Sequence, residues 1–450
     1  MNSQPHLRRI LTRTDLVIYG LVLLGPTAPY PVYGLVQQKT LGHAALAYLA
    51  AMVGVLFTAL SYAKMSSAYP AAGSTYTYTR RALNEHAGFL AGWSMMLDYF
   101  LIPLVSIIFG ALTAHRLIPG IPYAAWALGF TAALTAINIF GIRVTARASE
   151  IMMAIMSIFA VVFIVLCARY VVTQHGIAGL FDSRALYRPQ SFHMSALMLG
   201  AGIAALSYIG FDAISTLAED TVNPMRDIGF ATVLVCILQT AICFITVYLA
   251  ALVWPDYASY PEAETVILDI STRIGGPVLF GFLSFVILVA ALASALTGQA
   301  GASRLLYGMG RDGALPPRIF AYLHPRFATP TRSIYLMGAL CAFAAVAMRF
   351  EIAAELLNFG AFAGFVLVNL SVIRHFYVRQ RERSGLAFVT NLLFPALGAL
   401  VCLYLWASLS RNAKIAGFLW LLVGAIYLAI VTRGFRLAPK SLGSLSESSS

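Results

Sequence analysis

The sequence predicts an all-α integral membrane protein with twelve transmembrane helices. Of its 450 residues, 60% are hydrophobic and only 11% are charged, and the mean hydropathy is +0.80. A soluble globular domain carries roughly 25% charged residues, so this chain has too few ionic groups to cover a surface in water. Twelve segments reach or approach the roughly 20 apolar residues that cross a bilayer as a helix. They lie at about 16–37, 44–63, 87–114, 121–140, 149–172, 194–217, 228–254, 275–308, 333–349, 352–374, 386–409 and 415–432.

The basic residues indicate how the chain is oriented. The net charge of +12 does not point to nucleic acid, because the sequence has no basic run and no basic patch with interleaved aromatic residues. Most of the 30 bases lie in the connections that face the cytoplasm if both termini are cytoplasmic, whereas the longest acidic loop, residues 255–269, then lies outside. This asymmetry predicts a cell-membrane protein with cytoplasmic N- and C-termini.

The segments outside and between the spans are short, so we expect a single transmembrane domain. The basic N-terminus leads into an apolar run without a small-residue cleavage site, which we interpret as an uncleaved first span. The tail, about 437–450, is expected to be disordered. The five cysteines have no metal-ligand spacing and are interpreted as core residues. We expect no cofactor, no bound metal and no obligate protein partner.

The first span contains residues that interrupt a helix. Its sequence, LVIYGLVLLGPTAPYPVYG (16–34), places Gly25, Pro26, Pro29 and Pro31 within an apolar run. Proline removes a backbone donor and bends a helix. An unsatisfied backbone group in lipid costs several kcal/mol, so irregular backbone at this depth should face protein or a wet cavity.

A second interrupted span occupies the corresponding position in the other half of the chain. The sixth span, IAALSYIGFDAISTLAED (203–220), contains Gly210 and Asp212, and Gly210 lies 185 residues after Gly25. Breaks in the first and sixth spans are typical of an inverted five-plus-five repeat, with repeats at about 14–173 and 194–376 and two further spans at about 386–433. The half-helix ends then meet near the bilayer midplane and provide ligands for a polar substrate. The alternative is that both breaks only shape helix packing.

Three stretches resemble a known family. YPAAGSTYTYTRRALNEHAGFLAGW (69–93), SYIGFDAISTLAEDTVNPMRDI (207–228) and ASRLLYGMGRDGALP (302–316) are similar, in order, to segments of the amino acid–polyamine–organocation superfamily. The resemblance implies a twelve-span secondary transporter, with ten spans in the inverted repeat, that works by alternating access. Within the superfamily, GWSMMLDYFLIPLVS (92–106) and LNFGAFAGFVLVNLSVIRHF (357–376) resemble bacterial putrescine-importer-type permeases.

The chain departs from the family pattern at two positions. Amino acid transporters of the family usually have Gly-Ser-Gly in the first break, where backbone N–H groups hold the substrate carboxylate; Gly25, Pro26 and Thr27 stand there in this chain. Proline has no N–H to donate, which favours a diamine over an amino acid, although Thr27 can still offer both an N–H and a hydroxyl. Some proton-coupled relatives have a lysine in span five, where this chain has Met156.

Two carboxylates, Asp98 and Asp212, lie deep in predicted spans. A charged side chain at the centre of a membrane helix costs about 2.5–3.5 kcal/mol on insertion scales, so each should face a cavity or a partner. Asp212 is suited to act either as the counter-ion of a substrate ammonium group or as a proton carrier. Asp98 is suited to act as a second anion that binds the other ammonium group of a diamine. The alternatives are a carboxylate that caps the unwound backbone at Asp212 and a packing hydrogen bond at Asp98.

Aromatic residues flank these breaks and carboxylates. Aromatic faces attract cations by about 0.5–2 kcal/mol, although ordinary packing is the alternative for each residue. The predicted substrate site therefore consists of glycine, proline and threonine at the breaks, two carboxylates and four aromatic residues: Gly25, Pro26, Thr27, Tyr30, Asp98, Tyr99, Tyr208, Gly210, Phe211 and Asp212.

The sequence thus predicts a secondary transporter that imports a small amine, either a polyamine such as putrescine or an amino acid. Proton coupling through Asp212 is preferred to sodium coupling, for which the hydroxyls of Ser294, Thr297 and Ser303 are available. An amino acid exchanger on the same scaffold is the main alternative. An ion channel is disfavoured because no ring of like charges marks a pore. An enzyme is not expected, because no nucleophile motif, metal-ligand pair or glycine-rich phosphate loop is present.

Overall fold

The computed structural model describes residues 11–70, 74–140, 146–218, 221–311, 316–325, 327 and 329–434. Within these residues the secondary structure is helical apart from one isolated bridge between Leu11 and Thr221. Nine of the described segments are long and apolar enough to cross a membrane. Two shorter apolar helices and the interrupted first segment bring the total to the twelve spans that the sequence predicted. The predicted disordered tail lies outside the described residues.

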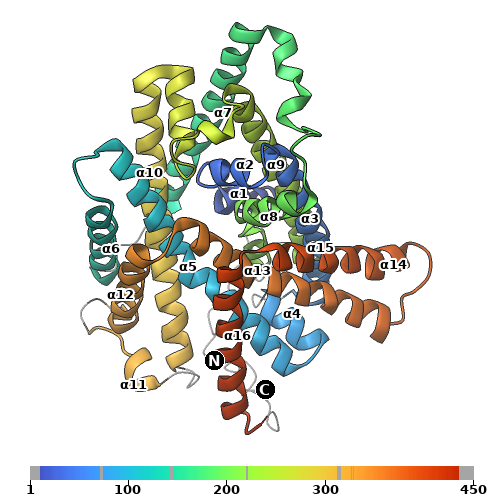
Figure 1. The fold of residues 1–450 in the computed structure, drawn as a ribbon. Helices are drawn as coiled ribbons and strands as arrows, with labels where there is room; N and C mark the ends of the chain where they lie inside the picture. Colours follow the sequence, from blue (N-terminus) through green and yellow to red (C-terminus); the bar gives the residue numbers. More distant parts are fainter. Residues whose placement is uncertain are drawn as a thin grey trace.

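The elements follow one another as a multi-span bundle (Figure 1). The two interrupted spans are α1 (Arg13–Leu24) with α2 (Tyr33–Lys39), and α8 (Met194–Ala204) with the 3₁₀ segments η3 (Ala205–Tyr208) and η4 (Phe211–Leu217). The other spans are α3 (Ala44–Ala68), α5 (Glu85–Leu117), α6 (Tyr123–Phe140), α7 (Ala146–His175), α9 (Pro224–Val253), α10 (Val266–Arg311), α12 (Thr331–Ala347), α13 (Phe350–Val372), α15 (Phe394–Ser408) and α16 (Arg411–Val431). Short connecting helices are α4 (Ser74–Ala82), α11 (Pro317–Phe320), α14 (Leu386–Phe388), the 3₁₀ turns η1 (Ile177–Phe181), η2 (Ser183–Ala185) and η5 (Tyr257–Ser259), and the π-helical segments η6 (Ile373–Arg379) and η7 (Val389–Leu393).

Side-chain caps fix where several spans begin. The hydroxyl of Thr12 accepts a hydrogen bond from the N–H of Asp15, whose carboxylate accepts one from the N–H of Thr12 in return, which forms a capping box at α1. Asn84 accepts from the N–H of Ala87 at 2.8 Å and caps α5. These contacts satisfy donors that the first turn of a helix leaves unpaired.

The structure refines two expectations about the spans. The run Val266–Arg311 consists of two helices that meet at Gly276, whose φ of 69° and ψ of −166° are not helical, directly before Pro277. The second of these helices begins close to residue 275, where the eighth span was predicted to begin, and the first is a helix in the connection before it. The second half of the sixth span, η4, is a 3₁₀ helix rather than an α-helix, and the irregular region already begins at Ala205.

The packing of the spans repeats between the two halves of the chain. α1 packs on α9 and α8 packs on α3, while α7 packs on α9 and α13 packs on α3. α3 also packs on α9, and α5 packs on α10. Exchanging the first five spans for the next five preserves this pattern, as an inverted repeat requires. The interrupted segments α1, α2 and α8 lie at the centre of the bundle (Figure 1).

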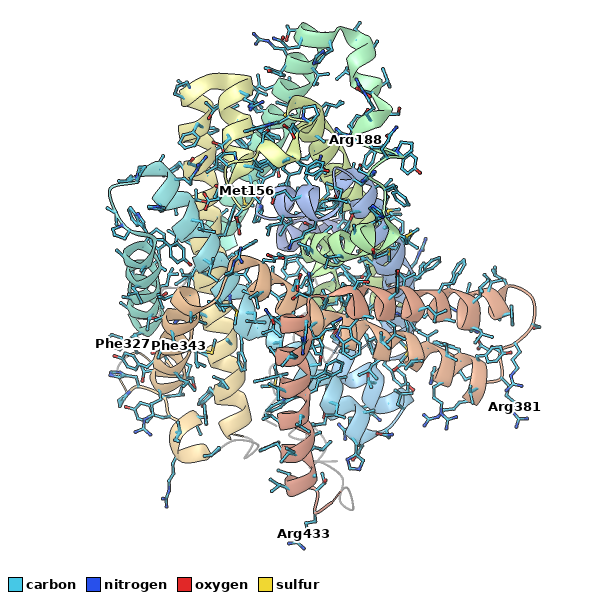
Figure 2. The ribbon with its side chains drawn as sticks, in the orientation of Figure 1. Met156, Arg188, Phe327, Phe343, Arg381 and Arg433 are labelled. Carbon is cyan, nitrogen blue, oxygen red and sulfur yellow. The ribbon has the colours of Figure 1, made fainter. Side chains whose placement is uncertain are left out.

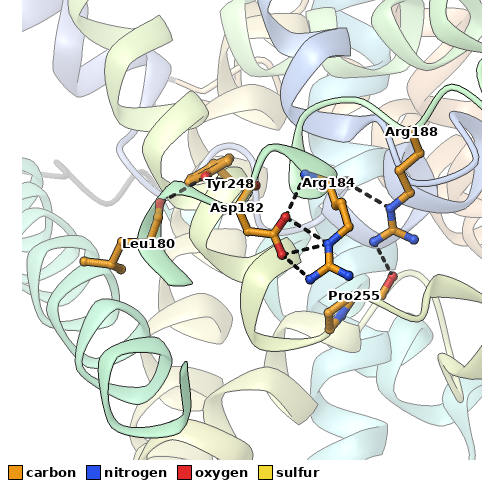
Figure 3. A network of polar contacts seen from close by, with 6 residues as sticks. All are labelled: Leu180, Asp182, Arg184, Arg188, Tyr248 and Pro255. Carbon is orange, nitrogen blue, oxygen red and sulfur yellow. Dashed lines mark hydrogen bonds and ion pairs between the residues drawn. The ribbon is translucent and has the colours of Figure 1, made fainter. Parts of the chain in front are cut away.

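A polar network holds the connection between α7 and α8 in place (Figure 3). The Arg184 guanidinium donates to both oxygens of Asp182 at 2.7 and 3.0 Å, and these hydrogen bonds hold the pKa of Asp182 below its usual value. Arg188 donates to the carbonyl of Pro255 at 3.2 Å, and the Tyr248 hydroxyl on α9 donates to the Asp182 carbonyl at 3.1 Å. The network fixes this connection to the end of α9.

Candidate substrate site

Both predicted breaks are present, and each turns on a glycine. Gly25 ends α1 with a φ of 73°, and its N–H donates to the carbonyl of Leu21 at 3.0 Å. Gly210 has a φ of 118° and separates η3 from η4. Positive φ values of this kind favour glycine because a side chain would be strained there. The prolines after Gly25 then keep α1 from continuing into α2.

The two breaks lie against each other. Ser207, in the sixth span, donates from its hydroxyl to the carbonyl of Ala28 in the first break at 3.2 Å. Gln239 on α9 bridges them further, because its Nε2 donates to the carbonyl of Gly25 at 3.0 Å and to that of Ser207 at 3.2 Å. Ser207 and Gln239 are both buried. Two interrupted helices are therefore joined through polar main-chain atoms inside the bundle.

Gln239 was missed by the sequence analysis. The sequence feature that could have identified Gln239 is its position as a lone amide within the apolar run VLVCILQTAICFI (233–245). A buried amide in a membrane helix needs partners, and the irregular backbone of a broken helix provides acceptors for it. The sequence carries no direct indication of which break would supply them.

The first break leaves fewer main-chain groups free than predicted. The carbonyl of Gly25 accepts from Gln239 and from the N–H of Ala28, and the carbonyl of Ala28 accepts from Ser207. Thr27 is different: its carbonyl accepts from the N–H of Tyr30 at 3.0 Å, but its own N–H and hydroxyl make no hydrogen bond within the described residues. Pro26 has no N–H. Thr27 is therefore the donor that this break can offer to a ligand.

The two predicted carboxylates lie close together. Asp98 on α5 is 5% exposed, and its Oδ1 has no hydrogen-bond partner in the described part of the chain. Asp212 lies within electrostatic range of Asp98, and its carboxylate accepts hydrogen bonds from the backbone amides of Gly210 and of Asp212 itself. Among the described ion pairs, none includes either carboxylate. Two acidic groups without a cationic partner favour a cationic ligand.

The absence of a side chain at Gly360 on α13 leaves room beside Asp98. A Cβ at this glycine would lie 3.3 Å from the Asp98 Oδ1 and 2.7 Å from the carbonyl oxygen of Ser94. The Ser94 hydroxyl donates to the Gly360 carbonyl at 3.0 Å, which holds α5 and α13 together at this level. The position of the Asp98 carboxylate is therefore set by a close helix contact.

Aromatic rings from three elements lie beside the carboxylates. The buried ring of Phe211, in η4, lies 5.4 Å from that of Tyr62 on α3 and 5.1 Å from that of Phe365 on α13. Tyr62 is also within electrostatic range of Asp212 and Asp98. Tyr62 and Phe365 were not predicted, because neither is near a break in the sequence.

The other predicted aromatic residues lie in different surroundings. Tyr99 is 46% exposed and lies within electrostatic range of both carboxylates. The buried Tyr30 packs 5.3 Å from the ring of Phe163 on α7, and its hydroxyl has no partner within the described residues. The Tyr208 hydroxyl donates to the carbonyl of Tyr48 at 3.2 Å. Ordinary packing therefore accounts for Tyr208.

Met156 lies beside the first break (Figure 2). Its methyl carbon is 3.5 Å from the position that a Cβ on Gly25 would occupy. The side chain next to the break is thus an uncharged thioether.

The hydroxyls considered for sodium lie in different surroundings. Ser294 bonds to Ser106 at 3.1 Å, and the Ser303 hydroxyl is buried. The side chain of Thr297 lies outside the described residues.

The two ends of the bundle, beyond α2 and beyond the start of α1, differ in how tightly they are packed. On one side α2 packs on α8, and Lys39 at the end of α2 forms an ion pair of 2.6 Å with Glu351 at the start of α13. A Cβ on Gly34 would lie only 2.0 Å from the carbonyl oxygen of Ala263, so α2 is seated tightly against this backbone. At the opposite side, a cavity of about 740 Å³ is lined by Arg13, Pro70 and residues 222–227. None of the predicted substrate residues lines this cavity.

We expect Gly34→Ala to disfavour the conformation in which α2 is seated. The added methyl group meets a backbone oxygen that cannot move independently, so α2 should shift away from Ala263. A cysteine introduced at Thr27 should then react several-fold faster with an impermeant maleimide added from the α2 side. The five native cysteines are buried and contribute little background.

Gly281→Ala on α10 is the matched control, because nothing lies within 4 Å of its added Cβ. It should leave the labelling rate of the Thr27 cysteine unchanged. Equal labelling rates in the Gly34 and Gly281 variants would show that the seating of α2 does not control access.

The interrupted helices and the buried polar site define a class of protein. Twelve spans, two of them interrupted by breaks that lie against each other, describe a multi-pass membrane protein of the secondary-transporter class. It is not an enzyme.

Comparison with known proteins gives the family. Residues 33–430 match the model of the amino acid permease family, to which the chain belongs. The chain is 34% identical over 438 residues to the low-affinity putrescine importer PlaP of Escherichia coli, covering 96% of each protein. It is 24% identical over 466 residues to the branched-chain amino acid permease BcaP of Bacillus subtilis, covering 96% of this chain and 95% of the relative. It is 29% identical over 406 residues to the vacuolar cationic amino acid transporter 4 of Arabidopsis thaliana, covering 84% of this chain and 65% of the relative.

Proposed function

We propose that this protein imports a small amine into the cell by proton-coupled symport, and that a diamine such as putrescine is its preferred substrate. The observation that carries the proposal is the pair of neighbouring carboxylates, Asp98 and Asp212, which have no cationic partner among the described ion pairs. The similarity to a putrescine importer over 96% of both chains supports it. The missing N–H at Pro26 supports it as well, because a diamine has no carboxylate to be held there.

The substrate would be held by groups from several spans. One ammonium group would lie at Asp212 and the other at Asp98, with the ring faces of Phe211 and Tyr62 beside them. Cation–π contacts add about 0.5–2 kcal/mol, depending on how far the ligand is desolvated. The N–H and hydroxyl of Thr27 would donate hydrogen bonds only to a ligand that has an acceptor. As donors they would therefore contribute little to the binding of a diamine.

Proton coupling would use Asp212, because it follows the sixth-span break directly and its carboxylate bonds to the backbone there. A change in its charge would alter the hydrogen bonds at Gly210 and hence the geometry of the break. Binding at a break and movement of the attached half-helices are thereby linked. In this proposal the termini lie in the cytoplasm, the α2 side faces outward, and the repeats extend over about 14–173 and 194–376.

The second candidate function is amino acid exchange. The free N–H and hydroxyl of Thr27 favour it, because they can bind a carboxylate at the first break. The branched-chain and cationic amino acid relatives are similar over most of this chain. In this case one carboxylate would hold the α-ammonium group, and uptake of one substrate would require release of another.

Transport by purified protein in liposomes tests both functions. With an acidic exterior and a neutral interior, we expect saturable accumulation of labelled putrescine that a protonophore abolishes and that sodium replacement leaves unchanged. Leucine and alanine in tenfold excess should reduce the rate by less than half. Putrescine uptake that needs a preloaded amine, with no response to the pH gradient, would instead establish an exchanger. Strong competition by leucine or alanine would contradict the diamine preference.

A further inference from the structure

A second cavity lies apart from the candidate substrate site. Its volume is about 490 Å³, and it lies between one end of α3, the start of α9, the segment η6 after α13, and the segment η7 with the start of α15. None of the predicted substrate residues lines it. The proposed orientation places these helix ends at the cytoplasmic edge of the membrane.

Two cations line this cavity, and neither has a carboxylate within ion-pair distance among the described residues. Lys64 donates to the hydroxyl of Thr390 at 2.9 Å and to the amide oxygen of Asn391, both of which are neutral groups. Arg226 is exposed, and its guanidinium makes no hydrogen bond or ion pair within the described residues. Its neighbour Asp227 is engaged by Arg13 at 2.7 Å. In the part of the chain that the structure describes, the cavity therefore presents two positive charges without a carboxylate partner.

A more distant carboxylate only partly neutralises the charge of Lys64. The carboxylate within electrostatic range of Lys64 is Glu382, which accepts a hydrogen bond from the Asn391 side chain at 3.1 Å. Glu382 does not line the cavity, whereas Lys64, Arg226 and Thr390 do. An anion entering between Lys64 and Arg226 would therefore meet two cations and the Thr390 hydroxyl. Ser61 and Ser67 also line the cavity, and their hydroxyls donate to Asn369 and to backbone carbonyls.

The other walls of the cavity are mostly apolar. They include Leu60, Phe230, Phe376 and Phe394, and the side chain of Phe230 is 47% exposed. Lys64 lies over the ring of Phe376 at 5.2 Å. A soluble anion gains nothing from such walls, whereas a phospholipid presents a charged headgroup and acyl chains together. Basic pockets between transmembrane helices on the cytoplasmic side are suited to anionic headgroups.

We propose that this cavity binds the headgroup of an anionic phospholipid of the cytoplasmic leaflet, with Lys64 and Arg226 at its phosphate and the acyl chains along Phe230 and Phe394. The lipid would connect α3 and α9, the second and seventh spans, with the helical pair formed by α13 and α15. The site is independent of the substrate, so it can exist whether the transported amine is a diamine or an amino acid.

Lipid binding to the purified full-length protein in non-ionic detergent tests the proposal. Native mass spectrometry should show phosphatidylglycerol retained in preference to phosphatidylcholine with the same acyl chains. Each basic residue near an anionic lipid surface contributes about 1 kcal/mol, which is about fivefold in affinity. Arg226→Gln and Lys64→Gln should therefore each weaken phosphatidylglycerol binding about fivefold, and the double variant should weaken it about 25-fold.

Arg318→Gln on α11 is the matched control, since Arg318 is an exposed arginine that does not line the cavity. It should leave phosphatidylglycerol binding unchanged. The Arg226 guanidinium has no hydrogen-bond or ion-pair partner within the described residues, so its loss should not impair folding even if the loss of Lys64 does. Equal retention of the two lipids, or unchanged binding in Arg226→Gln, would overturn the proposal. Full displacement of phosphatidylglycerol by glycerol 1-phosphate would identify a site for soluble anions and would overturn it too.

Discussion

Replacing Asp212 with asparagine is expected to reduce amine accumulation by at least about thirtyfold, because loss of one partner of a buried charge pair costs about 2–5 kcal/mol. The substrate ammonium would lose its counter-ion, and the transporter would lose its proposed proton carrier. Asparagine keeps the size of the side chain and one acceptor oxygen for the backbone amides of Gly210 and Asp212. The protein should therefore remain folded and inserted.

The measurement is accumulation of labelled putrescine in proteoliposomes with an acidic exterior, together with exchange of labelled for unlabelled putrescine without a gradient. Asp182→Asn, in the connection between α7 and α8, serves as the control for loss of a carboxylate outside the site. Loss of accumulation with retained exchange would identify Asp212 as a proton carrier. Loss of both would identify it as the substrate counter-ion. Coupled uptake at the normal rate would exclude Asp212 from the mechanism.

The breaks could be predicted from sequence because their cause is local. Gly25 and Gly210 adopt positive φ values that few other residues tolerate, and the prolines after Gly25 cannot continue a helix. The carboxylates were predictable for a related reason: a charge within an apolar span is costly wherever it points. Neither inference depends on which spans are neighbours in space.

The contacts between the breaks could not be predicted in this way. Gln239 reaches Gly25 across 214 positions in the sequence, and the ring of Phe365 reaches Phe211 from a span that has no break. Such contacts depend on tertiary packing, which a single sequence does not specify. The same limit explains why the first break was expected to keep free carbonyls that Gln239 and Ser207 occupy.

The second large effect is expected for Gln239→Leu, which should destabilise the protein and nearly abolish transport. Leucine fills the volume but removes the amide donor that the carbonyls of Gly25 and Ser207 share. The Gly25 carbonyl keeps the N–H of Ala28, whereas the Ser207 carbonyl loses its side-chain donor. A buried unpaired polar group costs about 1–3 kcal/mol, although interhelical hydrogen bonds in membranes average about 0.6 kcal/mol where other partners can be found. We expect the free energy of unfolding to fall by about 1–3 kcal/mol. Because the same amide joins both breaks, its loss should also separate them and disorganise the site between them.

Thr232→Val is the matched control for this variant. Thr232 is buried earlier on the same helix α9, and its hydroxyl donates to the carbonyl of Ile228 at 2.8 Å, so its replacement removes a hydrogen bond within α9 that involves neither break. Thermal unfolding in detergent and putrescine uptake in liposomes should both change in Gln239→Leu and remain near normal in Thr232→Val. A role in stability alone predicts a lowered unfolding temperature with normal affinity for putrescine below that temperature. A role in joining the breaks predicts weakened putrescine binding even where the variant is fully folded.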